Sequence, residues 1–261
     1  RDVSARGTEF DAEEEHHRPD FIERLVVGIF GKKVLDDPEP MGMKRMRAEE
    51  FPEVYPATTT EFAEAVEGDE EEVALFRPLL ARTQLEEKEL MLCFSAEECG
   101  WDADAFHRCV DSMGAAVVMG RTAGGAVFGG YNPKGWIGLG EDRDSIAAFL
   151  FTWPDGDTSS PAIKLPKTGG ASMAVVDKQF AGIQFGAEGL TIHLGSQGHE
   201  PRLAKSRLGS YYERCPGGGR SLFSPDEVKS AMLTDLKVWV AKGAGEEWQL
   251  DGIVWKTKAS T

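Results

Sequence analysis

The feature that most constrains the fold is a glycine-rich hairpin pattern in the middle of the chain. Two apolar runs, Ala115–Thr122 and Ala126–Tyr131, flank Gly124-Gly125, and a two-glycine reversal between apolar runs is typical of a β-hairpin. Gly129 and Gly130 lie inside the second run, where a missing side chain indicates a bulge or a close approach of another backbone. This pattern contains no nucleophile beside a base, so it predicts a scaffold and not a catalytic site.

Short strands separated by turns dominate the chain from residue 90 onward. One helix is expected over Asp102–Met113, with Asp102 as its N-cap. Short strands with frequent turns and one or two helices predict an α+β, mainly β fold, a two-sheet antiparallel β-sandwich. Besides the hairpin, strands are expected at Leu90–Ala96, Ser145–Trp153, Ala171–Asp177, Leu190–Leu194, Ser210–Cys215 and Met232–Ala241.

The N-terminal third differs in composition and divides into two parts ahead of a domain at 90–261. Residues 1–18 are polar and acidic, and this predicts a flexible arm. Residues 19–89 predict an amphipathic helix, a Pro-rich extended segment lying over a surface, and short helices at Glu61–Val66 and Val73–Leu80. The acidic run Asp69–Glu72 lacks the spacing of a calcium loop and is interpreted as solvated surface.

The amphipathic helix is the predicted partner-binding element. Asp20 and Glu23 form a capping box at its start. Its stripe either packs on the domain's own surface or docks on a membrane or a partner. The predicted partner-binding residues are Phe21, Ile22, Leu25, Val26, Ile29 and Phe30, followed by Lys32 and Lys33 at the helix end.

Charge and cysteine content exclude several classes of protein. The net charge is −15, and residues 1–89 hold 24 acidic and 12 basic side chains, which argues against nonspecific nucleic-acid binding. No apolar run approaches the roughly 18–20 residues of a membrane span. Four cysteines without a Cys-x-x-Cys pair are not a disulfide framework and indicate a reducing compartment.

The sequence presents few groups that could carry out chemistry. His107 lies on the expected helix one turn from Asp104 and Asp111, which fits an oriented base or a structural histidine at a helix–sheet seam. The histidines of the domain lack zinc-ligand spacing, and no nucleophile elbow is present. We therefore predict no catalytic residues, no metal, no cofactor and no enzyme activity. A peroxide-defence effector using His107 or a thiol such as Cys99 is the alternative class.

The order of motifs resembles the TLDc domain, which oxidation-resistance proteins share with regulators of the vacuolar proton pump. The resemblance runs from about Leu90 to Trp239. The form of the domain in this chain is similar to that of plant and green-algal TLDc proteins. The similarity is greatest in Arg121–Trp136, Ser145–Thr158 and Leu208–Phe223. The matching structural-motif residues are Gly100, Trp101, His107, Gly129, Gly130, Tyr131, Trp136 and Trp239, with Phe149-Leu150-Phe151 and Phe185-Gly186 between them.

The resemblance implies a β-sandwich that acts as an interaction module. The chain lacks the glycine-rich run that animal members carry before a late strand. The binding partners of animal members are therefore a poor guide to the partners of this chain. The favoured expectation is an auxiliary or repair-type factor on a membrane-embedded thylakoid or photosystem complex in the chloroplast, with a stress-protective role. A start at Arg1 and not Met fits a removed or omitted leader. The alternative is a cytoplasmic regulator of proton-pump assembly, recruited to a vacuolar or endomembrane surface.

Overall fold

The computed structural model describes residues 56–179, 181–195, 200–244, 247–250 and 253–256. The predicted arm 1–18 and the amphipathic helix therefore lie outside the described residues. The helical elements are α3 (Glu71–Phe76), η3 (Arg77–Leu80), α4 (Ala96–Cys99), α5 (Ala103–Val110) and η4 (Pro216–Gly218). The strands are β1 (Leu90–Ser95), β2 (Ala116–Thr122), β3 (Val127–Asn132), β4 (Asp142–Arg143), β5 (Phe149–Trp153), β6 (Ile163–Pro166), β7 (Val175–Val176), β8 (Ile183–Phe185), β9 (Leu190–Ile192), β10 (Leu203–Ser206), β11 (Ser230–Ala241), β12 (Glu247–Leu250) and β13 (Ile253–Lys256).

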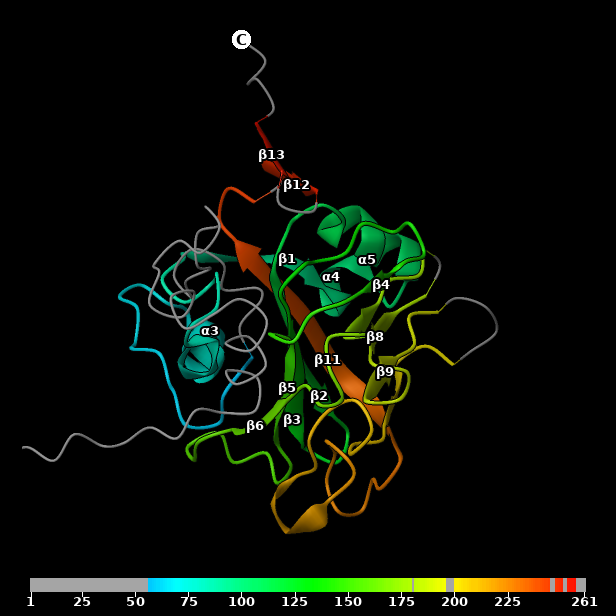
Figure 1. Ribbon diagram of the computed structural model, residues 1–261. Coiled ribbons are helices and arrows are strands. Elements are labelled where there is room, and N and C mark those ends of the chain that lie inside the picture. Colours follow the sequence, from blue (N-terminus) through cyan, green and yellow to red (C-terminus); the bar gives the residue numbers. More distant parts are fainter. Residues whose placement is uncertain (1–55, 180, 196–199, 245–246, 251–252, 257–261) are drawn as a thin grey trace, which may run out of the picture. The chain divides into compact units, whose positions relative to one another are not determined.

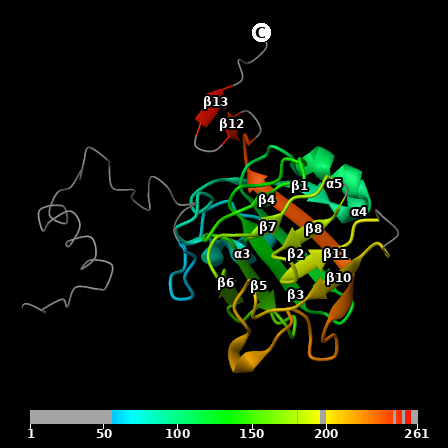
Figure 2. The same ribbon diagram turned by 45° about the vertical axis from the view of Figure 1, so that its right-hand side comes forward.

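The long strand β11 joins the two layers of an antiparallel sandwich (Figure 1). Its first residues pair with β10, which leads through β9, β8 and β7 to β4. The rest of β11 pairs with β2 on one edge and β1 on the other, and β2 leads through β3 and β5 to β6. Figure 2 shows β8 and β10 in front of β2 and β3, as two layers. The α+β, mainly β sandwich predicted from the sequence is confirmed.

The strands of the β2–β3–β5 layer are apolar on both faces. In β2, Val118 faces the core between the two layers, while Val117 and Met119 face the opposite side. Phe149 and Phe151 of β5 also face that opposite side. Because alternate residues of a strand point to opposite faces, this layer buries apolar side chains on both of its faces and needs a cover on each.

The second cover is the segment that carries α3 and η3. Phe76, Leu79 and Leu80 pack on the outer face of the β2–β3–β5 layer, and the Phe76 ring centroid lies 5.2 Å from that of Trp239. Figure 1 shows α3 on one side of β2, β3 and β5, with β8 and β9 on the other. The predicted helix around Val73–Leu80 is confirmed as α3 and η3.

The glycine pair in β3 allows neighbouring strands to approach closely, as its position in the sequence predicts. A Cβ added to Gly129 would lie 2.0 Å from the Val118 carbonyl oxygen and 2.4 Å from the Phe151 ring. The register between β2 and β3 is unbroken here, so the pair serves close packing and forms no bulge. A side chain at this position would push β2 and β5 apart.

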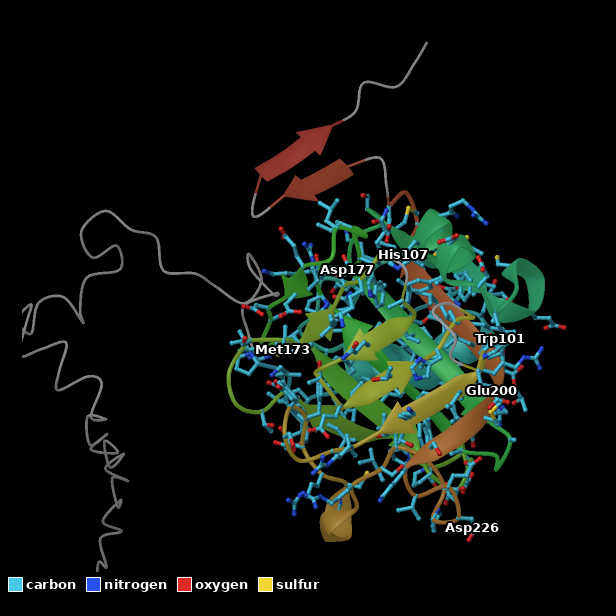
Figure 3. The ribbon with its side chains drawn as sticks, turned by 90° about the vertical axis from the view of Figure 1, so that its right-hand side faces the viewer. Trp101, His107, Met173, Asp177, Glu200 and Asp226 are labelled. Carbon is cyan, nitrogen blue, oxygen red and sulfur yellow. The ribbon has the colours of Figure 1, made fainter. Side chains whose placement is uncertain are left out.

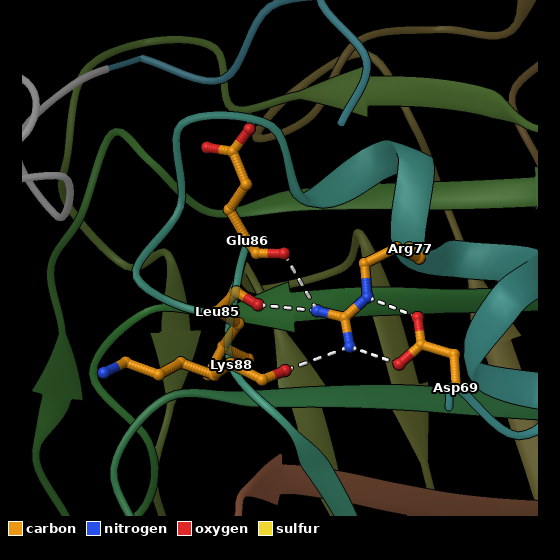
Figure 4. Close-up of polar contacts among 5 residues, drawn as sticks. All are labelled: Asp69, Arg77, Leu85, Glu86 and Lys88. Atoms are coloured by element: carbon orange, nitrogen blue, oxygen red, sulfur yellow. Dashed lines mark hydrogen bonds and ion pairs between the residues drawn. The ribbon is translucent and has the colours of Figure 1, made fainter. Parts of the chain in front are cut away.

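Arg77 organises the covering segment (Figure 4). Its side chain is 1% exposed, and its Nε and Nη2 donate to the two Asp69 carboxylate oxygens at 2.6 and 2.7 Å. Nη1 donates to the carbonyls of Leu85 and Glu86, and Nη2 donates to that of Lys88. The acidic run was predicted to be solvated surface, but the Asp69 side chain is 8% exposed because it neutralises this buried guanidinium.

Two predicted elements are wrong. The chain over Glu61–Val66 is not helical. Instead the Ala63 amide donates to the Pro78 carbonyl at 2.8 Å. Phe62, its largest apolar side chain, is 52% exposed. A six-residue segment without a buried face cannot offset the cost of helix nucleation.

The predicted strand at Ser210–Cys215 is replaced by turns, with a single bridge between Lys167 and Tyr212. Tyr212 is wholly buried, and its hydroxyl donates to the Ala174 carbonyl at 2.6 Å. This buried tyrosine therefore anchors a loop and not a strand. The predicted strands at Ser145–Trp153 and Ala171–Asp177 shorten to β5 and β7.

Replacing the buried guanidinium tests the role of Arg77. We expect Arg77→Ala to lower the free energy of unfolding by about 3–5 kcal/mol, because it leaves the Asp69 carboxylate buried without its partner. Urea denaturation followed by tryptophan fluorescence measures the change. Arg207→Ala is the control, because this arginine is 61% exposed in its pair with Glu188, and it should cost less than about 1 kcal/mol. Equal costs for the two variants would contradict the assignment.

A buried lysine makes stability depend on pH. Lys164 Nζ donates to the Leu79 carbonyl at 2.6 Å, and burial lowers its pKa to about 8 from 10.5. Between these values the unfolded chain binds more protons than the folded chain, so stability rises with pH. We expect the free energy of unfolding to rise, relative to Lys164→Met, by up to about 3 kcal/mol across this window, since one pKa unit is worth about 1.4 kcal/mol. Denaturation of both proteins from pH 8 to pH 10.5 checks this, and parallel profiles would refute it.

Candidate functional site

The candidate site lies at one end of the sandwich, where α5 packs against the loop that follows β7. Asp102 begins α5, and its carboxylate accepts a hydrogen bond from the Ala105 amide at 2.8 Å, as its position predicted. Phe106 anchors the helix in the core, with ring centroids 5.4 Å from Phe94 and 5.3 Å from Trp136. This packing fixes the direction in which His107, the next residue, extends.

His107 is buried, and both of its ring nitrogens face oxygen atoms. Figure 3 labels His107 and Asp177 close together near one end of the domain. Nδ1 lies 2.8 Å from Asp111 Oδ1, one helical turn away. Nε2 lies 3.0 Å from the Lys178 carbonyl oxygen and 3.2 Å from that of Ala181. Of the two carboxylates that the sequence placed within one turn, the structure selects Asp111. Since each nitrogen faces acceptors, the ring is held as an imidazolium in this arrangement.

Asp177 completes the cluster from the other side. It is wholly buried, and its Oδ2 accepts hydrogen bonds from the amides of Ile137 at 2.7 Å and Gly138 at 3.0 Å. Gly138 has φ +67°, and a Cβ added to it would lie 2.4 Å from Asp111 Oδ2. The loop backbone therefore approaches both carboxylates closely, and a glycine is required where it passes.

The electrostatics of the cluster follow from these contacts. Burial by itself would lower the pKa of His107, but the hydrogen bond and charge of Asp111, with smaller contributions from Ala181 and Asp177, raise it above 6.5. Burial raises the pKa of Asp177, against the two amides that stabilise its charged form. The cluster thus holds one wholly buried carboxylate, Asp177, and one partly exposed carboxylate, Asp111, beside the histidine.

Most of the other motif residues named from the sequence are buried and pack within the sheet. Trp101 is an exception. Trp101 is half-buried, and the Arg202 guanidinium lies 5.3 Å from its ring centroid beside an open hollow that Glu97 and Asp235 also line. Gly100 precedes it with φ +83°. The residues buried in the sheet are Gly129, Gly130 and Tyr131 of β3, with Trp136 after it and Trp239 of β11. The predicted partner-binding residues lie outside the described residues.

Burial makes the thiols of Cys93, Cys109 and Cys215 less reactive. All four cysteines are free, and the Cys99 and Cys109 side chains are hydrogen-bonded to each other. Burial raises the pKa of Cys93 to about 12 and also raises those of Cys109 and Cys215. A raised thiol pKa lowers the fraction of reactive thiolate near neutral pH.

Sequence reasoning missed Asp177 as part of this cluster. It was placed at the end of an expected strand, 70 residues after His107, and no spacing rule links the two. A lone acidic residue ending a buried apolar run was the only local signal. Its role depends on the fold, which brings the loop after β7 against α5.

The comparisons with known proteins agree with this fold. The TLDc domain family matches residues 69–219, more than half of the chain. The chain belongs to the TLDc family. The match begins at Asp69, so it includes the segment with α3 and η3, and it ends before β11. A comparison with curated proteins finds no match.

Membership gives a general expectation of function. TLDc domains are protein-interaction modules and are generally non-catalytic, in a family associated with oxidative stress and the vacuolar proton pump. Across the described residues, no helix is long and apolar enough to cross a membrane. The chain's partner and compartment remain predictions.

A double-mutant cycle tests the contact between the loop and α5. We expect Gly138→Ala to cost about 2 kcal/mol of unfolding free energy, from the positive φ and from the collision with Asp111. In the Asp111→Ala background this cost should fall by about 1 kcal/mol, because only the backbone strain remains. Denaturant titration of the four proteins measures the coupling. Identical costs in the two backgrounds would show that the loop does not press on Asp111.

Proposed function

We propose that this chain is a non-catalytic interaction protein that docks on a large, membrane-associated assembly. The favoured assembly is a thylakoid or photosystem complex in a plastid, where the chain acts as an auxiliary or repair-type factor with a stress-protective role. Membership of the TLDc family supports the interaction role. The plastid assignment is supported by the similarity of Arg121–Trp136 and Leu208–Phe223 to plant and green-algal sequences.

The observation that carries the non-catalytic part is that both ring nitrogens of His107 are engaged by other residues. A general base needs a ring nitrogen that can reach a substrate proton. Here Nδ1 is engaged by Asp111, and Nε2 is engaged by the carbonyls of Lys178 and Ala181. The histidine therefore ties α5 to the loop after β7 and presents neither nitrogen to a substrate.

The raised pKa values of three thiols argue against peroxide chemistry at those three cysteines. Peroxide reduction by cysteine requires a thiolate, and burial raises the pKa values of Cys93, Cys109 and Cys215. Peroxide consumption by the purified parent protein, abolished by replacing a single cysteine, would reverse this conclusion.

The docking element remains the predicted amphipathic helix of residues 19–33. Its apolar stripe with two lysines at the end suits a partner surface better than a bare membrane, because its polar face is nearly neutral. The regulator of proton-pump assembly is the competing identity, and it differs only in which subunits the helix meets.

Native separation of the tagged protein from its own cells in mild detergent tests the proposal. Mass spectrometry of the co-migrating chains identifies the assembly. Photosystem or other thylakoid subunits would support the plastid role, and proton-pump subunits would replace it with the alternative. Migration as a free chain under gentle conditions would contradict docking.

The docking helix is tested by a double substitution in the same assay. We expect Phe21→Asp with Ile29→Asp to weaken association at least about tenfold, because two buried apolar side chains are lost from the contact. Arg24→Ala, on the polar face, is the matched control and should stay bound. The thermal transition of the domain should be unchanged in both variants. Retention of the first variant would exclude the helix as the contact.

A further inference from the structure

A buried carboxylate oxygen at the candidate site is left without a hydrogen-bond donor. Asp177 is wholly buried, and its Oδ2 is satisfied by the amides of Ile137 and Gly138. Its Oδ1 has no hydrogen-bond partner among the described residues. Buried polar atoms are nearly always paired, and an unpaired carboxylate oxygen is costly, so this atom calls for a partner of another kind.

The neighbouring histidine has the orientation of a metal ligand. Its Nε2 faces the carbonyl oxygens of Lys178 and Ala181, which assigns a proton to that nitrogen. Nδ1 faces the Asp111 carboxylate. Metal-binding histidines commonly donate one N–H to a backbone carbonyl, which fixes the ring and leaves the other nitrogen for the cation.

The three side chains converge on one point. One nitrogen of His107 and one carboxylate oxygen from each of Asp111 and Asp177 all lie within 4.8 Å of one another. A proton on Nδ1 neutralises only one of the two negative charges and leaves Asp177 Oδ1 unpaired. A divalent cation would neutralise both and would supply that oxygen with a partner.

We propose that His107, Asp111 and Asp177 bind a divalent transition-metal cation of the Mn²⁺ to Zn²⁺ series. One imidazole with two carboxylates suits these ions, whereas Mg²⁺ and Ca²⁺ prefer oxygen ligands alone. Ligand bonds of about 2.0–2.2 Å place ligand atoms roughly 3 Å or more apart. The pair His107 Nδ1 and Asp111 Oδ1, now 2.8 Å apart, need open by only a few tenths of an ångström when its proton leaves.

The site is accessible from one side. An open hollow borders His107 and Asp111, and its other lining residues are Asp104, Arg108, Ile137, Gly138, Leu139 and Gln179. Water can occupy the remaining coordination positions from this side. Asp104 draws cations toward the hollow, Arg108 opposes them, and neither belongs to the cluster of three. Residue spacing does not predict the complete site, because Asp177 lies 70 residues after His107 and joins the cluster only through the fold.

Titration of the metal-stripped full-length chain with Co²⁺, followed by its ligand-field absorption, tests the proposal. His16 and His17 also offer imidazoles, so every protein in the series carries His16→Ala and His17→Ala. We expect one saturable Co²⁺ site per chain, displaced by Zn²⁺ but not by excess Mg²⁺. Asp177→Asn should weaken it at least about tenfold. Asp104→Asn, on the rim of the hollow, is the matched control and should retain it.

A second ligand variant keeps the test decisive if the first one does not fold. If Asp177→Asn loses its thermal transition, Asp111→Asn replaces it in the same titration, because it removes a ligand charge from a more exposed residue. Absence of a saturable site in the parent would overturn the proposal. Equal Co²⁺ affinity in the parent and in the folded ligand variant would overturn it as well.

Discussion

The structure depends on a sheet that is apolar on both faces. Because β2 and β5 present large apolar side chains in both directions, neither face can meet water, and each needs its own cover. The strands from β7 to β10 provide one cover and the segment with α3 and η3 provides the other. The second cover is held in shape by a charge, since Arg77 fastens it to Asp69 and to three carbonyls. An apolar contact surface therefore relies on a buried ion pair. Burying the two charges costs desolvation free energy, and removing one partner costs more because the other charge is left buried and unpaired.

The polar cluster at the end of the sandwich follows a different logic. Arg77 uses its five donors on five acceptor contacts, so its network is complete. The network of His107, Asp111 and Asp177 is incomplete, because one buried oxygen lacks a partner in the described residues. Incomplete buried networks are retained where something other than stability is gained. By this contrast, Arg77 is a polar group that stabilises the fold, whereas the cluster of His107, Asp111 and Asp177 is available to a ligand.

Local patterns in the sequence predicted the local structures well. The two-glycine reversal, the Asp102 cap and the burial of β5 depend on neighbouring residues, and all three were found as expected. Strands of three or four residues, such as β8 and β10, were missed because they are too short to show alternation. The strand expected at Ser210–Cys215 is a loop, because its buried aromatic residue Tyr212 anchors the chain there without strand pairing.

The candidate site was only half visible in the sequence. The pairing of His107 with Asp111 was open to prediction because helical spacing places them on one face. The contribution of Asp177 was not, because the packing of α5 against the loop after β7 is a property of the whole fold. Phe106 and Gly138, which position the two sides, carry no sign of this role in their own sequence neighbourhood.

The place of β11 in the chain has a consequence for how the protein is made. This strand pairs with β1, β2 and β10, yet it follows all three in the chain, and its residues follow those of β1 by about 140 positions. Until Ser230–Ala241 has left the ribosome, those three strands each have an edge without its neighbour. Closure of the sandwich is thus a long-range step, in which the cost of joining distant segments is met only after β11 has been made. A nascent chain of this kind exposes these strand edges until then, and a chaperone that shields such edges would be of most use to it during that interval.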